Sequence, residues 1–126
     1  MFTLQTIEMD DAVIVQCTGR LVRSEAAYCL RDAVRANRGC RSIVLDMSEV
    51  EAVEGGGLGM LAFLQRWAEE NGIRMRLLNP SLRVQQRLKQ VELQSSCVFE
   101  VERDSKVLHL AGLPDREYWI ASNLAA

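Results

Sequence analysis

The chain has 126 residues, of which 48% are hydrophobic and 25% charged, and its formal net charge is -2. This length favours one domain with a substantial core, and the hydrophobic content argues against disorder. The slightly acidic balance argues against a nucleic-acid binder, which usually carries a basic face. No apolar run approaches the roughly 18 residues needed to span a membrane, and the N-terminus has no signal-peptide pattern. We therefore expect a cytoplasmic protein without direct membrane insertion.

The first part of the chain predicts a hairpin and a helix. Residues 3–7 and 12–18 are short β-rich runs separated by a polar turn at residues 9–11. Ser24 is then a suitable N-cap for a helix that runs to about Asn37. Apolar residues recur in this helix at intervals of three and four, which places one face inward.

The second part predicts a strand and helix alternation. Residues 43–45 form a continuous apolar run, as expected for a central strand covered on both faces. A loop over residues 48–54 leads into a second helix, which is closed by Asn71 and Gly72. A strand over residues 73–78 follows. Ser81 then caps a third helix, and residues 98–101 form a last strand.

The order strand, strand, helix, strand, helix, strand, helix, strand predicts an α/β fold with a mostly parallel sheet. We assign residues 1–102 to this domain and residues 103–126 to a C-terminal helical extension of it. The extension carries apolar side chains that we expect to pack on the domain or on a second copy, namely Tyr118, Trp119 and Leu124.

Four glycines crowd into the five positions from Gly55 to Gly59, between the central strand and the second helix. A phosphate-binding loop needs a lysine after its glycines, and a dinucleotide fingerprint needs a different glycine spacing directly after the strand. Neither pattern is present, so we expect no nucleotide chemistry and no cofactor. The glycines instead allow unusual backbone angles and the close approach of another backbone.

Candidate catalytic and metal-binding residues do not form a recognisable set. His109 is the only histidine and lies in the C-terminal extension. Four carboxylates cluster near the glycines without a second ligand type, namely Asp46, Glu49, Glu51 and Glu54. We interpret them as solvated or helix-capping charges. The four cysteines form no C-x-x-C pair and are interpreted as free, buried thiols: Cys17, Cys29, Cys40 and Cys97. An enzyme or a metal protein is not indicated.

The second helix has two apolar stripes instead of one. One stripe holds Leu58, Leu61, Ala62 and Gln65, and the other holds Met60, Phe63, Leu64 and Trp67. A helix that lies on a sheet buries one face only, so two explanations are open. Either the helix is buried on both sides or covered by the C-terminal tail, or the second stripe is an exposed patch for a protein partner.

Several segments, in this order, resemble the STAS domain, the fold of bacterial anti-sigma factor antagonists. They are Gly19-Arg20-Leu21, Ile43-Val44-Leu45-Asp46-Met47-Ser48, Gly57-Leu58-Gly59-Met60-Leu61 and Leu77-Leu78-Asn79-Pro80-Ser81. The resemblance covers about residues 12–101. It implies a four- to five-stranded sheet with an N-terminal hairpin and with helices packed mainly on one side.

The resemblance also implies a function and shows two departures from it. The family's loop reads Asp-Ser-x-Gly-Leu-Gly, and a partner kinase that doubles as an anti-sigma factor phosphorylates its serine. Here Glu54 stands at the aspartate position and Gly55 at the serine position, and Val22 stands where many members have an acidic residue. Because glycine has no hydroxyl, the serine switch cannot operate at position 55. At Phe63 and Trp67 the family often has polar residues.

We therefore expect a non-catalytic interaction module that is not switched by serine phosphorylation. Its partner would be an anti-sigma factor or kinase-like ATPase, and a homodimer is also compatible. Two alternatives stay open: a STAS subunit that regulates the ATPase of a lipid-exporting ABC transporter, and a domain that senses a small ligand or nucleotide. The predicted partner interface consists of Val22, Glu54, Gly55, Gly56, Leu58, Met60, Phe63 and Trp67.

Overall fold

The computed structural model describes residues 1–103, which form a five-stranded sheet and three helices. The strands are β1 (Phe2–Met9), β2 (Ala12–Leu21), β3 (Ser42–Val53), β4 (Arg74–Leu78) and β5 (Val101–Glu102). The helices are α1 (Ser24–Arg35), α2 (Gly56–Glu70) and α3 (Leu82–Gln94). The predicted order of elements is therefore confirmed. The predicted C-terminal extension lies outside the described residues apart from Arg103, and His109 lies outside them too.

The strands lie in the order β1-β2-β3-β4-β5, so β3 is the central strand. β1 and β2 form the expected antiparallel hairpin, in which Met9 pairs with Ala12, and Asp10 adopts a positive φ of 48° in the turn. All other pairings are parallel. The sheet is thus mixed, with an N-terminal hairpin and a parallel remainder, as the sequence predicted.

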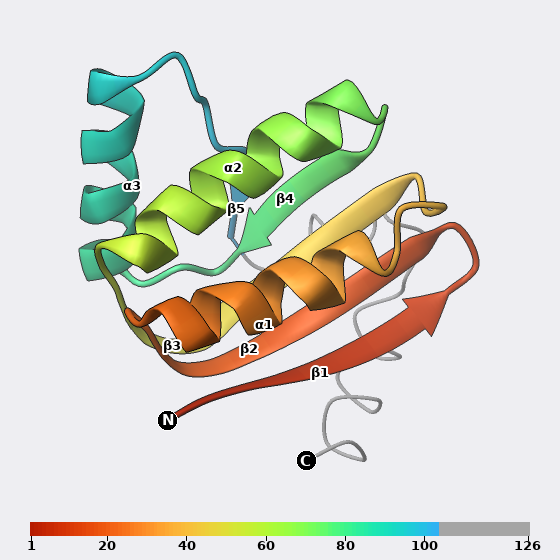
Figure 1. Cartoon of the computed structure of the whole chain (residues 1–126), viewed down its shortest axis with the longest axis horizontal. Coiled ribbons are helices and arrows are strands. Elements are labelled where there is room, and N and C mark those ends of the chain that lie inside the picture. Colours follow the sequence, from red (N-terminus) through yellow and green to blue (C-terminus); the bar gives the residue numbers. More distant parts are fainter. Residues whose placement is uncertain (104–126) are drawn as a thin grey trace.

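All three helices pack against one face of the sheet (Figure 1). Their inward side chains join alternate residues of the strands in one hydrophobic core, which includes Leu30 of α1, Leu61 of α2 and Leu88 of α3. Val13 and Leu45 of the sheet belong to the same core and are fully buried. The opposite face of the sheet carries a separate cluster of Ile14, Val44 and Leu78. β3 is therefore buried on both faces, which explains its continuous apolar run.

Local sequence explains where two helices end or begin. Asn71 is the C-cap of α2, and Gly72 follows it with a φ of 68°, a conformation that glycine adopts readily. Ser81 caps α3, and its hydroxyl accepts a hydrogen bond from the Val84 amide at 3.2 Å. The expectation for Ser24 was wrong. Arg23 is the N-cap of α1 without a side-chain hydrogen bond, and Ser24 is the first residue of the helix.

Two predicted boundaries were wrong. The expected loop over residues 48–54 is mostly strand, because β3 continues to Val53 and pairs with the second half of β2. Two register shifts interrupt this pairing, at Gln16/Thr18 and at Gly19/Arg20. The last strand comprises Val101 and Glu102 instead of residues 98–101. Residues 97–100 have no regular secondary structure, although the Glu100 carbonyl accepts a hydrogen bond from the Leu77 amide of β4 at 2.8 Å.

Within the described part of the chain, no helix is long and apolar enough to cross a membrane.

Candidate interaction surface at the start of α2

A tight turn joins β3 to α2 and requires glycine at position 55. The Gly57 amide donates a hydrogen bond to the Glu54 carbonyl at 3.0 Å, which closes the turn. Gly55 stands at its second position with φ 52° and ψ -118°. These angles are those of a type II′ turn, in which the second residue is usually glycine because a side chain would be strained. The backbone angles therefore give a structural reason for glycine at position 55.

The glycines of this segment have different environments. A Cβ atom on Gly57 would lie 2.8 Å from the carbonyl carbon of Leu21 and 2.9 Å from its Cγ, which is too close. Gly57 is therefore glycine because α2 packs tightly on the end of β2. By contrast, a Cβ atom on Gly56 or Gly59 would meet no atom within 4 Å, and neither residue has a positive φ. Nothing in the packing of the described chain requires glycine at these two positions.

The second stripe of α2 is divided between surface and core. Phe63 is 48% exposed, whereas Trp67 is only 8% exposed and belongs to the hydrophobic core. Met60 is half-buried and packs against that core, as Leu58 does. The first explanation, a covered helix face, holds for Trp67, whereas a partner patch at the exposed part of the stripe stays a prediction. Trp67 is a core residue, and the exposed patch reduces to Phe63 with the edge of Met60.

The structure brings the other predicted site residues close to the same turn. The Glu54 amide donates a hydrogen bond to the Leu21 carbonyl at 3.2 Å, and half-buried Val22 directly follows Leu21. The Glu54 carboxylate also forms an ion pair with Arg87 of α3 at 3.3 Å. Arg87 was missed from the sequence because the two residues are 33 positions apart. No local pattern near Glu54 indicates which helix lies beside it.

The carboxylates near the glycines do not act together. Asp46 is buried, and its Oδ1 accepts hydrogen bonds from the Ser48 amide at 3.0 Å and from the Ser48 hydroxyl at 2.6 Å. The interpretation of Asp46 as a solvated charge was therefore wrong. Glu49 and Glu51 are exposed. Among residues 1–103, no group of three or more histidine, cysteine or acidic side chains is arranged to hold a metal ion.

The cysteines also differ from one another. All four are free, but only Cys17 is buried, whereas Cys40 and Cys97 are half-buried and Cys29 is exposed. The expectation of a buried thiol was thus wrong for Cys29. Burial, with a smaller contribution from the charge of Asp46, raises the pKa of the Cys17 thiol to about 12. Cys17 is consequently protonated at neutral pH and acts as a small core residue.

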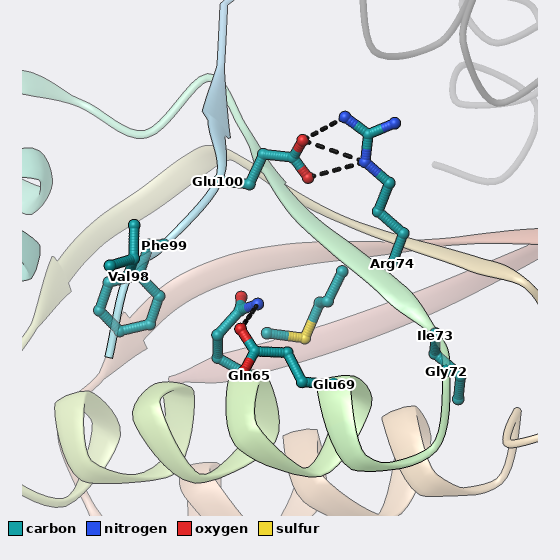
Figure 2. Close-up of a pocket in the computed structure, with 9 residues that line it drawn as sticks. Gln65, Glu69, Gly72, Ile73, Arg74, Val98, Phe99 and Glu100 are labelled. Atoms are coloured by element: carbon teal, nitrogen blue, oxygen red, sulfur yellow. Dashed lines mark hydrogen bonds and ion pairs between the residues drawn. The ribbon is translucent and has the colours of Figure 1, made fainter. Parts of the chain in front are cut away.

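A pocket of about 630 Å³ lies at the other end of α2, between the helix and the start of β4. Figure 2 shows Gln65 and Glu69 on the helix side, with Arg74 and Glu100 paired on the other side of β4. The lining residues are Gln65, Glu69, Gly72, Ile73, Arg74, Met75, Val98, Phe99 and Glu100. None of the predicted interface residues belongs to it. The pocket is therefore separate from the surface at the start of α2.

The fold has many solved relatives. The Thermotoga maritima protein TM1081 matches with a TM-score of 0.71 and 22% identity, over 86% of this chain and 93% of that one. The phosphorylated Bacillus cell fate determinant SpoIIAA matches with a TM-score of 0.65 and 17% identity, over 87% and 96% of the two chains. An anti-sigma factor antagonist from Mycobacterium paratuberculosis gives a TM-score of 0.61 and 19% identity, over 80% and 85%.

A partial match has a different context. The murine anion transporter Slc26a9 matches with a TM-score of 0.57 and 27% identity, over 71% of this chain but only 16% of the transporter. No curated protein sequence matches the chain. The model of the STAS domain family matches residues 3–113, which is most of the chain and includes every predicted interface residue. The chain therefore belongs to the STAS domain family.

Proposed function

We propose that this protein is a non-catalytic interaction module that binds a protein partner through the surface at the start of α2. This surface is defined by Gly56, Gly59, Met60 and Phe63. The structural similarity to anti-sigma factor antagonists supports the proposal, and it favours an anti-sigma factor or a kinase-like ATPase as the partner. Serine phosphorylation at position 55 does not control the binding, because Gly55 has no hydroxyl.

One observation carries the proposal: two helical glycines without a packing role lie beside a half-exposed phenylalanine. A glycine within a helix costs about 0.5–1 kcal/mol relative to alanine. At Gly56 and Gly59 no close packing within the described chain offsets this cost, since a methyl group would meet open space. Glycine does, however, allow the backbone of a partner to approach the helix closely. Phe63, one turn after Gly59, then supplies an aromatic anchor of the kind that dominates binding energies.

The test begins with affinity purification of a tagged protein from its native host, followed by a direct binding measurement with the recovered partner. Phe63→Ser should weaken binding at least tenfold while leaving the Tm nearly unchanged. Leu93→Ser is the matched control, because Leu93 is an exposed apolar residue near the far end of α3. Equal affinities for wild type and Phe63→Ser would refute the proposed surface.

A second candidate function is regulation of a membrane transporter, and the partial match to Slc26a9 favours it. In that case the recovered partner would be a transporter, or the ATPase subunit of one, and it would be enriched in membrane fractions. Recovery of an anti-sigma factor or a kinase-like protein from the soluble fraction would instead support the first candidate. Both candidates use the same surface, so the Phe63→Ser comparison applies to either partner.

A further inference from the structure

The pocket at the C-terminal end of α2 exists because β5 is short. β5 pairs only with Leu77 and Leu78, the last two residues of β4. Within residues 1–103, the outer edge of the first half of β4 therefore has no paired strand. The pocket of about 630 Å³ lies between this edge, α2 and the irregular segment that leads into β5. Its volume is typical of small-molecule sites and far exceeds the space of one water molecule.

Hydrogen bonds hold two sides of the pocket in place. The Phe99 amide donates to the Glu92 carboxylate of α3 at 2.7 Å, which fixes the segment before β5. The Ile73 amide donates to the Ala68 carbonyl at 2.8 Å, which closes the turn from α2 into β4. The pocket is therefore largely preformed, and a preformed site loses little conformational entropy when it binds a ligand.

The most buried lining side chains are apolar. Ile73, Met75 and Phe99 are all less than one-tenth exposed, and all three belong to the hydrophobic core. Val98 adds apolar surface that is mostly exposed. The pocket therefore offers an apolar wall, one part of which is aromatic, to the body of a ligand.

One polar group of the lining lacks a partner. Gln65 is 7% exposed, and its Oε1 accepts no hydrogen bond from the described chain. Its Nε2 faces the Glu69 carboxylate at 3.4 Å, and this orientation of the amide follows because a carboxylate only accepts hydrogen bonds. Figure 2 shows the amide pointing away from α2 into the space that the lining residues enclose. Because a buried acceptor without a donor is unfavourable, the Gln65 oxygen indicates a ligand that donates a hydrogen bond.

The charges around the pocket leave one carboxylate unpaired. Arg74 donates hydrogen bonds to both carboxylate oxygens of Glu100, so these two charges compensate each other. Glu69 forms no ion pair with any of residues 1–103. It contacts the nitrogen of the Gln65 amide, so its carboxylate lies close to the unpartnered oxygen of the same amide. The lining therefore presents an amide oxygen beside an uncompensated negative charge.

We propose that this pocket binds a small primary amine with an apolar body. An ammonium group carries three donors and no acceptor, so one nitrogen can donate to the Gln65 oxygen and to the Glu69 carboxylate together. The apolar body then packs on Ile73 and Phe99. A carboxylate or phosphate ligand would instead meet the charge of Glu69 and would bring no donor for Gln65. None of the lining residues belongs to the surface at the start of α2, so this site is additional to the proposed function.

An NMR titration of the full-length protein with phenethylamine tests the proposal, because this probe combines one ammonium group with one aromatic ring. The backbone amide signals of Gly72, Ile73 and Phe99 should shift in a saturable manner, whereas that of Phe63 should not. The matched control ligand is 3-phenylpropanoate, which has a similar body but carries a carboxylate. It should bind about tenfold more weakly or not at all.

Two variants separate the polar acceptors from the apolar wall. Gln65→Leu should weaken phenethylamine binding about tenfold, since it removes an acceptor for a charged donor. Its Tm should not fall, because the variant also removes a buried oxygen without a partner. Glu69→Gln should weaken binding as well, and Glu69 is exposed, so this variant tests the site even if Gln65→Leu is unstable. Glu70→Gln is the matched control, because Glu70 is exposed on the same helix but does not line the pocket.

Three outcomes would overturn the proposal. The first is the absence of saturable shifts at the lining residues when phenethylamine is added. The second is equal affinity for 3-phenylpropanoate, which would show that the pocket selects only for apolar surface. The third is an affinity that neither Gln65→Leu nor Glu69→Gln changes. Partner binding by the Phe63 surface is measured separately with Phe63→Ser, so a failure here leaves the proposed function untouched.

Discussion

At its N-terminal end α2 begins with glycines and leaves Gly56, Gly59 and Phe63 on the surface, whereas at its C-terminal end Gln65, Trp67 and Ala68 are buried. Phe63 and Trp67 illustrate the difference best. They are four residues apart and so lie on the same side of the helix, yet one is 48% and the other 8% exposed.

The difference lies in what surrounds each half of the helix. Trp67 shares the hydrophobic core with Phe99, which lies in the segment between α3 and β5. Phe63 stands out as an exposed aromatic residue one turn earlier. A stripe of apolar residues on a helix therefore does not by itself distinguish core from interface. The distinction depends on how far the neighbouring segments extend along the helix.

The largest expected effect comes from truncating the two aromatic residues separately. Trp67→Ala should lower the free energy of unfolding by about 3–5 kcal/mol, because it leaves a cavity in the core. Phe63→Ala should cost less than about 1.5 kcal/mol, since half of that side chain is already in water. Chemical denaturation of both variants measures the difference. Similar losses of unfolding free energy in the two variants would show that Phe63 is as much a part of the core as Trp67.

The second expected effect concerns the glycine with a packing role. Gly57→Ala should destabilise the protein by about 1–3 kcal/mol or more, because the new methyl group meets the backbone of Leu21, which no rotamer change relieves. Gly56→Ala is the matched control, because its methyl group meets open space. Thermal unfolding of the two variants provides the measurement. A stable Gly57→Ala protein would mean that α2 does not pack on the end of β2 as closely as described.

Much of this architecture could be predicted from the sequence because local rules decide it. Apolar residues repeat every two positions in the strands and every three to four positions in the helices, and these repeats predicted the order of the elements. Ser81 correctly marked the start of α3, and the Asn71-Gly72 pair marked the end of α2. The extension of β3 through residues 48–53 was missed although Val50 and Ala52 alternate with exposed Glu49 and Glu51. The nearby glycines favoured a loop there, and pairing with β2 across two register shifts overrides that local preference.

The candidate site was predictable in position but not in detail. The glycine cluster located the turn at the start of α2, but the separate reasons for Gly55 and Gly57 depend on φ and on the distance to Leu21. The burial of Trp67 and the ion pair between Glu54 and Arg87 could not be predicted from the sequence either. Both depend on which segments the fold brings beside α2, and those segments are distant in sequence.

A smaller effect, of opposite sign, is expected at Gly59. Gly59→Ala should raise the free energy of unfolding by about 0.5–1 kcal/mol, because alanine is the better helix former and its methyl group meets open space. The same change should weaken partner binding. Gly39→Ala is a control, since Gly39 also faces open space but lies in the turn after α1. A stabilised Gly59→Ala protein with unaltered affinity would show that no partner backbone approaches the helix there.

The smallest expected effect lies beside the pocket at the C-terminal end of α2 and depends on pH. The hydrogen bonds from Arg74 lower the pKa of the Glu100 carboxyl below its ordinary value of 4.5. The folded state therefore holds this proton more weakly than the unfolded state does. The stabilisation is fully present above the unfolded pKa and is lost as the pH falls through the folded one. Glu100→Gln should accordingly reduce stability near pH 7 and approach the wild type in acid.

Glu49→Gln serves as the exposed control, and denaturant unfolding from pH 7 to pH 3 provides the measurement. A stability gap between wild type and Glu100→Gln that does not narrow in acid would show that the ion pair with Arg74 does not form in solution. In that case Arg74 and Glu100, which line the pocket, would each be solvated separately, as the exposed glycines at the other end of the helix are.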